Sequence, residues 1–273
     1  MTRWTDRAHV FAAVVLVGLL LFPLYWAVVS SLTAEARLFG ATRIVPDELV
    51  FDHYLAIFRD RAFWIPIRNS LIVATSTAVL AVMFGAPCAY ALARLRFAGS
   101  ALMLALIFAV SMFPQIAIVP PLFLALRSVG LINTFPGLVL PYLTFAMPLT
   151  IWLLVGFFRQ LPSELEEAAL MDGASRFRAF VAIVLTLSGP GLATTAILTF
   201  LYSWNEFLFA LSFTLGPERQ TVPVAIALFR GMYQVPWGQI LAAAVVATLP
   251  VTLLVLAFQR RIVQGLTAGA VKG

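Results

Sequence analysis

The sequence predicts an all-α membrane protein with six transmembrane helices, from its composition and from the lengths of its apolar stretches. Hydrophobic residues make up 62% of the 273 residues and charged residues only 11%, and the mean hydropathy is +0.99. Soluble domains have about 25% charged residues, so a soluble fold of this length could not cover the apolar side chains. In a bilayer, α-helices satisfy the backbone polar groups within each span.

Six apolar stretches are long enough to cross a bilayer, which takes about 20 residues in a helix. They lie at about 10–32, 69–93, 99–126, 137–158, 184–214 and 238–259. Arg127 is the only charged residue between Phe97 and Phe158, and SVGLINTFPG around it has the Gly, Asn and Pro of a tight turn. We therefore expect a hairpin there, within one transmembrane domain that covers 1–273.

Prolines within the spans predict bends, because proline frees a backbone carbonyl of the preceding turn. Those prolines are Pro23, Pro87, Pro114, Pro120, Pro121, Pro148 and Pro250.

The basic residues predict the orientation in the membrane. With six spans, segments 1–9, 94–98, 159–183 and 260–273 share one side and hold ten of the 18 Lys and Arg residues. The other side holds the remaining eight in longer loops, so the positive-inside rule favours cytoplasmic termini. We expect a multi-pass protein of the cell's inner or plasma membrane. The net charge of +6 is scattered in single residues and pairs, which does not favour a nucleic-acid partner.

A short acidic segment interrupts the apolar sequence before the fifth span. Ser163 and Glu166 have the spacing of a capping box, which predicts a helix start, and Gly173 is placed to end that helix in the left-handed conformation. The carboxylates of Glu164, Glu166 and Glu167 would stabilise the N-terminal turn of this helix by interacting with the helix dipole. Ser175 would open a second helical segment.

About nine helical residues are too few to be stable alone in water, so this segment must pack against something. Leu165, Ala168 and Ala169 form a shallow apolar face at helical spacing. An interfacial helix on lipid is one alternative, but such helices favour basic polar faces beside an anionic leaflet. We therefore favour docking to a partner protein.

The stretch EAALMDGA, followed by Ile183-Val184-Leu185, resembles the EAA signature of permease subunits of binding-protein-dependent ABC importers. The matching residues are Glu167, Ala168, Ala169, Asp172, Gly173, Ala174, Ile183 and Leu185. The resemblance implies the ABC importer permease fold, with a cytoplasmic coupling helix at about 163–173 that inserts into a cleft of the ATPase subunit. The residues it assigns to ATPase coupling are Glu166, Glu167, Ala168, Ala169, Met171, Asp172, Gly173 and Ala174.

One position departs from that signature. Thr186 stands where the family usually has proline, and Pro190 follows four residues later. We therefore expect the start of the fifth span to bend at a different turn.

Two further stretches are similar to the maltose-type carbohydrate importers. They are SWNEFLFAL at Ser203–Leu211 and the tail QRRIVQGLTAGAVKG, which in that family reaches between the ATPase subunits. The resemblance implies import of a di- or oligosaccharide, with a glycerol phosphate importer as an alternative. It also implies a heterodimer with a second permease subunit, two ATPase subunits and an extracytoplasmic sugar-binding protein.

A possible substrate pathway involves the only ionisable residue well inside a span, Glu206, because an intramembrane carboxylate is expensive unless it faces water or a partner. A structural bond between helices is the other interpretation of Glu206. The residues considered for the pathway are Gln115, Tyr202, Trp204, Asn205 and Glu206. We expect Asn205 and Glu206 to face the protein interior.

We expect no catalytic residues, cofactor or metal site in this chain. A phosphate-binding loop needs a lysine after its glycines, and the only lysine is Lys272, so ATP and Mg would be bound by the ATPase partners. An ion-coupled secondary carrier would need several titratable groups at mid-membrane. A membrane enzyme would need a cluster of reactive side chains, whereas His9, His53 and Cys88 are scattered.

Overall fold

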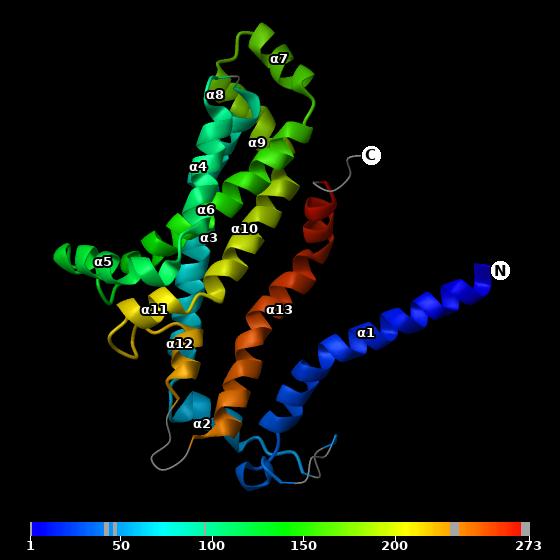
Figure 1. The fold of residues 1–273 in the computed structure, drawn as a ribbon, viewed down its shortest axis with the longest axis vertical. Coiled ribbons are helices and arrows are strands. Elements are labelled where there is room, and N and C mark those ends of the chain that lie inside the picture. Colours follow the sequence, from blue (N-terminus) through cyan, green and yellow to red (C-terminus); the bar gives the residue numbers. More distant parts are fainter. Residues whose placement is uncertain (1, 41–43, 46–47, 96, 230–234, 269–273) are drawn as a thin grey trace. The chain divides into compact units, whose positions relative to one another are not determined.

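The computed structural model describes residues 2–40, 44–45, 48–95, 97–229 and 235–268. Within these residues the chain folds into helices, with no strand (Figure 1). The helices are α1 (Thr2–Ser31), η1 (Glu35–Arg37), α2 (Asp52–Arg59), α3 (Trp64–Arg94), α4 (Ser100–Met112), α5 (Gln115–Ser128), α6 (Phe135–Gln160), α7 (Ser163–Met171), α8 (Arg176–Ala179), η2 (Phe180–Val184), α9 (Leu185–Leu187), α10 (Gly189–Trp204), α11 (Leu208–Phe213), α12 (Val222–Ala227) and α13 (Trp237–Ala268). The predicted all-α class is confirmed.

The described part of the chain has four helices long and apolar enough to cross a membrane, within α1, α3, α6 and α13. Two bent pairs also pass the same test: α4 with α5, bent by 90°, and Arg176–Leu187 with Gly189–Trp204, bent by 77°. Six candidate spans result if each bent pair counts as one.

The third and fifth spans are not the continuous segments 99–126 and 184–214 that we expected. Phe113 has an extended backbone between α4 and α5, because the ring of the following proline, Pro114, disfavours helical geometry at the residue before it. The fifth span breaks at Ser188, before Gly189 and Pro190. This span ends at Trp204, and the remainder of its apolar run forms the separate short helix α11.

The expected hairpin at Arg127 is present. Helix α5 ends at Ser128, and the turn contains two residues with positive φ, Gly130 at 71° and Asn133 at 60°. Gly137 must be glycine here, because a Cβ at this position would lie 2.0 Å from the carbonyl oxygen of Leu131. Pro114 and Pro190 lie at breaks between helices. The other prolines of the spans lie inside continuous helices.

The chain divides into two compact units. The first comprises Met1–Trp64 and Ala225–Pro250. In it the Glu35 carboxylate accepts hydrogen bonds from the backbone N–H groups of Trp237 and Gly238, both at 2.9 Å. These bonds satisfy orphan donors at the N-terminus of α13, which is where a carboxylate is most favourable.

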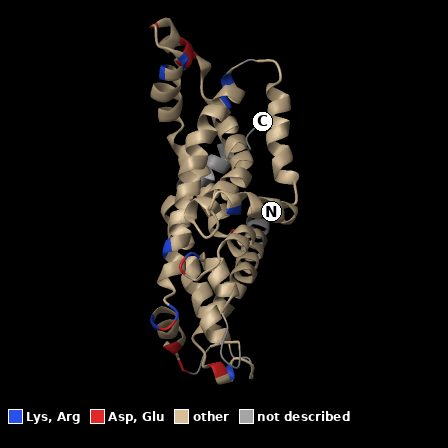
Figure 2. Cartoon of the chain, turned by 90° about the vertical axis from the view of Figure 1, so that its left-hand side faces the viewer, with Lys and Arg blue, Asp and Glu red and all other residues tan. Residues whose placement is uncertain are grey.

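The second unit, Ile65–Val224 with Val251–Gly273, contains two apolar clusters. One is centred on Tyr142, Phe209 and Phe213, and the other on Phe158 and Phe180. Helix α6 contributes to both clusters and packs against α4, α10 and α11. Charged residues of this unit gather around α7 and α8 at one end, while the middles of the long helices lack them (Figure 2).

Candidate functional site: the coupling helix

The predicted short helix is present as α7, which projects at one end of the second unit (Figure 1). Its C-terminus is closed by two backbone bonds, from Gly173 N–H to the Leu170 carbonyl at 3.1 Å and from Ala174 N–H to the Ala169 carbonyl at 2.9 Å. Together with a φ of +84° at Gly173, these bonds form a Schellman motif. The role predicted for Gly173 in ending the helix is therefore confirmed.

The predicted capping box is wrong. The N-cap of α7 is Pro162, and no side chain makes a capping hydrogen bond there. Glu166 is turned away from the helix N-terminus and buried, with 8% of its surface exposed. A buried carboxylate needs hydrogen-bond or charge partners, and those partners come from another helix.

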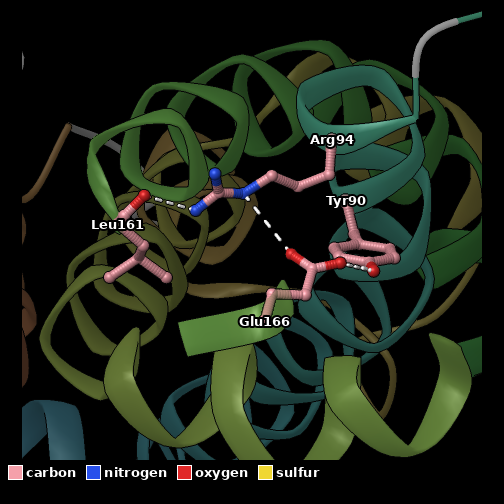
Figure 3. Close-up of polar contacts among 4 residues, drawn as sticks. All are labelled: Tyr90, Arg94, Leu161 and Glu166. Carbon is pink, nitrogen blue, oxygen red and sulfur yellow. Dashed lines mark hydrogen bonds and ion pairs between the residues drawn. The ribbon is translucent and has the colours of Figure 1, made fainter. Parts of the chain in front are cut away.

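Glu166 is held by two residues at the C-terminal end of α3 (Figure 3). The Tyr90 hydroxyl donates a hydrogen bond to Glu166 Oε1. Arg94 Nε lies 3.8 Å from Glu166 Oε2, and Arg94 Nη2 donates to the Leu161 carbonyl at 2.5 Å. Tyr90 and Arg94 are one helical turn apart, so both side chains project from the same face of α3.

The opposite face of α7 is exposed. Met171 is 88% exposed and Leu165 47% exposed, and the other exposed residues here include Glu164, Glu167, Ala168 and Asp172. Ala169, Leu170 and Ala174 are half-buried. Of the expected apolar face, Leu165 and Ala168 therefore face outward, whereas Ala169 turns partly toward the rest of the chain.

The segment after α7 begins as expected with Ser175. Its hydroxyl accepts a hydrogen bond from the Arg178 backbone N–H at 3.3 Å, which caps α8. Phe177 on this short helix is 75% exposed. Large apolar side chains therefore lie at the surface on both sides of Gly173.

The structure separates the residues considered for the substrate pathway. Gln115 Nε2 donates to the Tyr202 hydroxyl at 2.9 Å, so these two residues are brought together from α5 and α10. Trp204 is buried, and its ring stacks on that of Phe200 with 5.7 Å between the centroids.

Asn205 and Glu206 differ from each other. The predicted interior position is confirmed for Glu206, which is buried, and is wrong for Asn205, which is exposed and donates to the Leu201 carbonyl of its own helix at 2.8 Å. The Glu206 carboxylate accepts from the backbone N–H groups of Phe209 at 2.8 Å and Ala210 at 3.1 Å. These bonds fix the start of α11, which is a local structural role.

Two residues of the site, Tyr90 and Arg94, were not expected from the sequence. Their only signal there is a polar pair at i and i+4 near the end of an apolar span, where Arg94 would ordinarily serve as a membrane-boundary anchor. In the described part of the chain, no group of three or more His, Cys, Asp or Glu residues is placed to hold a metal ion. The tail Leu266–Gly273 is predicted to contact the ATPase subunits. The structure does not describe the side chains of these residues.

Comparison with known families places this helix in context. Residues 65–268 match the family described as binding-protein-dependent transport system inner membrane component. The match covers most of the chain, so the protein belongs to this family. The predicted membership of the permease family is confirmed.

Curated relatives match over nearly their whole lengths. The trehalose transport system permease protein SugB of Mycobacterium tuberculosis is 46% identical over 94% of both chains. The trehalose/maltose transport system permease protein MalG of Thermococcus litoralis is 39% identical over 97% of this chain and 96% of the relative. The sulfoquinovosyl glycerol transport system permease protein SmoH of Agrobacterium fabrum is 41% identical over 93% and 89%.

A solved structure establishes the fold. A chain from the crystal structure of a bacterial ABC transporter that imports the acidic polysaccharide alginate superposes with a TM-score of 0.78, covering 95% of this chain and 98% of that one. The two sequences are 24% identical. The predicted ABC importer permease fold is confirmed.

Proposed function

We propose that this chain is a permease subunit of an ATP-driven, binding-protein-dependent sugar importer. It would form half of a heterodimeric pathway for a di- or oligosaccharide. The observation that carries this proposal is α7: a short helix of the EAA signature, anchored on one face and exposed on the other. The relatives named for trehalose, maltose and diacetylchitobiose transport support a sugar substrate.

The exposed face of α7 suits a protein partner. Met171 and Leu165 expose apolar surface beside Glu167 and Asp172, and an apolar centre with a polar rim is typical of protein interfaces. Ala168, between them, has the smallest side chain that keeps helical propensity high, so a partner can approach the backbone closely. We propose that each of two ATPase subunits binds such a helix, one from this chain and one from the second permease subunit.

ATP chemistry belongs to the partners in this proposal. The only lysine of the chain, Lys272, cannot complete a phosphate-binding loop, which needs glycines before its lysine and Ser or Thr directly after it. The ATPase subunits would bind ATP and Mg, and an extracytoplasmic binding protein would deliver the sugar. Because α7 follows the fourth span, a cytoplasmic α7 requires cytoplasmic termini, in agreement with the distribution of basic residues.

The proposed mechanism converts nucleotide binding into a change of access. When ATP brings the two ATPase subunits together, each carries the permease helix bound to it. Movement of α7 then tips the spans attached to it, so that the pathway changes from inward-open to outward-open and receives the sugar. Gln115 and Tyr202 remain candidates for contact with the sugar, since their side chains meet between α5 and α10.

Two variants of α7 test this function. Ala168→Trp places a large ring on the proposed interface, and Gly173→Val places a branched side chain at a φ of +84°, where L residues are strained. Both should insert into the membrane normally, yet either lose the ATPase subunits in a pull-down or retain them with little sugar uptake into proteoliposomes.

A matched control is Val129→Trp. Val129 is exposed in the α5–α6 turn, one span away from α7, so this variant should retain the ATPase subunits. Wild-type pull-down together with wild-type uptake in both α7 variants would rule out the coupling role.

A further inference from the structure

Helix α7 packs against α8 and η2 and has one buried side chain. Every residue of α7 is described, and only Glu166 among them is buried. A nine-residue helix depends on tertiary contacts for its stability and position. The contacts of Glu166 therefore matter for how firmly α7 is held in place.

Those contacts all lead to α3. Tyr90 and Arg94 contact the two carboxylate oxygens of Glu166 (Figure 3). Arg94 also donates to the carbonyl of Leu161, which lies two residues before the start of α7. Helix α3 thus holds both α7 and its lead-in segment. The hydrogen bond from Tyr90 to an ionised carboxylate is about twice as strong as a neutral one, and Arg94 adds an ion pair at 3.8 Å.

The ring of Tyr90, on the α3 side of the contact with Glu166, is closely packed. The centroids of the Tyr90 and Phe180 rings are 4.8 Å apart. The Phe180 and Phe158 rings meet edge to face, with 6.4 Å between their centroids. All three rings belong to the same apolar cluster. Because close-packed interiors transmit strain rather than absorb it, a force on the Tyr90 hydroxyl moves α3 with it.

Helix α3 is bonded at its other end as well. Asn69 Nδ2 donates to the carbonyls of Glu218 at 2.9 Å and Gln220 at 3.0 Å, and the Val222 N–H donates to Ser70 Oγ at 2.8 Å. From Asn69 to Tyr90 an α-helix rises about 32 Å, close to the thickness of the bilayer core. One continuous helix therefore joins α7 to the 214–222 segment at the opposite membrane face.

We propose that Glu166, Tyr90 and Arg94 form a latch, here called the α3 latch, that makes α3 move with α7. In this role Glu166 is a positioning residue: its carboxylate faces α3, and the ATPase would contact the other face of α7. The inference rests on the proposed function of α7 as a coupling helix. It adds that α3 is the element through which ATPase motion reaches the far side of the membrane.

The test uses conservative variants of the whole importer. Glu166→Gln removes the charge paired with Arg94, and Tyr90→Phe removes only one hydroxyl. The complexes are reconstituted in proteoliposomes with the binding protein, and sugar uptake and ATP hydrolysis are measured together. We expect normal ATPase association and a rise of about fivefold or more in ATP hydrolysed per sugar imported, the scale expected when a hydrogen bond to a charged group is lost.

The double variant tests whether the two residues act through one contact. Residues that share an interaction are non-additive, so Tyr90→Phe should raise the ratio of ATP to sugar less in the Glu166→Gln chain, whose neutral amide oxygen is a weaker acceptor, than in the wild-type chain. The controls remove similar interactions at exposed positions away from α3 and α7. Glu48→Gln loses the ion pair with Arg37, and Tyr25→Phe loses the hydrogen bond to the Ile44 carbonyl; both should keep the wild-type ratio of ATP to sugar.

The outcomes separate this proposal from the one on which it rests. If both single variants assemble and keep the wild-type ratio, the α3 latch has no coupling role while the proposed function stands. If the wild-type chain neither binds ATPase subunits nor supports uptake, the proposed function itself fails. Should Glu166→Gln fail to assemble, Tyr90→Phe decides, because loss of one hydroxyl preserves the packing of the ring on Phe180.

Discussion

Glu166 and Glu206 are two buried carboxylates in the same unit, and the chain satisfies them in different ways. Glu166 is bound by two side chains of α3, Tyr90 and Arg94, and Tyr90 is 76 positions away in the sequence. Glu206 is bound by backbone N–H groups only three and four positions further on. The first carboxylate connects two helices, whereas the second fixes the start of one. Burial of an acidic residue therefore does not by itself indicate a substrate pathway.

The comparison also separates stability from coupling. Loss of Glu206 leaves backbone donors of α11 unpaired within the apolar cluster around Phe209 and Phe213. Loss of Glu166 leaves the C-terminal Schellman motif of α7 and its packing against α8 and η2 in place, because neither involves the carboxylate. Variants of Glu206 should therefore affect folding, and variants of Glu166 should affect transport.

The largest expected effect is that of Glu206→Leu. The change leaves the N–H groups of Phe209 and Ala210 buried without an acceptor, and each unsatisfied group costs about 1–3 kcal/mol. We expect a clear fall in the thermal unfolding temperature of the purified complex in detergent. Glu48→Leu, the same change at an exposed position, is the control. Equal unfolding temperatures for Glu206→Leu and wild type would show that the N-terminus of α11 does not depend on Glu206.

The second prediction compares Glu206→Gln with Glu166→Gln. At position 206 glutamine keeps one acceptor oxygen, so we expect membrane insertion to be normal and stability to fall by about 1 kcal/mol, with less assembled complex. At position 166 we expect little change in unfolding temperature and a poorer ratio of sugar to ATP. If Glu206→Gln instead preserved stability but abolished uptake per assembled complex, Glu206 would belong to the substrate pathway.

The sequence predicts well those features that depend on neighbouring residues. Span lengths follow from apolar runs, the end of α7 follows from Gly173, and the coupling segment follows from a contiguous motif. The break after Phe113 follows from Pro114, although most other prolines in the spans remain within continuous helices. Whether a proline breaks a span depends on what satisfies the freed carbonyl, and that partner comes from elsewhere in the fold.

The α3 latch could not be predicted because its partners are distant in the sequence. Ser163 and Glu166 satisfy a local capping rule, but Tyr90 and Arg94 offer Glu166 a hydroxyl and a charge in a buried setting. The tertiary partners determine its position. In the same way, the sequence shows that Glu206 lies within an apolar run. Its role at the start of α11 depends on a helix break that the hydropathy of 184–214 does not indicate.

The smallest expected effect concerns a third carboxylate, the exposed Glu218. Asn133 Nδ2 donates to Glu218 Oε1 at 3.0 Å, and Asn133 Oδ1 accepts from the Leu215 N–H at 3.0 Å, so the pair joins the α5–α6 turn to the segment after α11. The hydrogen bond from Asn133 is the main cause that lowers the pKa of Glu218 below 4.5, and the charge of Arg219 adds to it.

A lowered folded-state pKa fixes the sign of the pH dependence. The ionised carboxylate is favoured in the folded state, so its contribution to stability is complete above the unfolded pKa and is lost as the pH falls through the folded one. The unfolding temperature of wild type should therefore exceed that of Glu218→Gln slightly at neutral pH, and the difference should shrink as the pH falls below about 4.3, the pKa of glutamate in an unfolded chain. Because Glu218 is exposed, solvent keeps this effect smaller than those at Glu206. A difference that stayed constant across this pH range would mean that the shape of the side chain, rather than its charge, stabilises the turn.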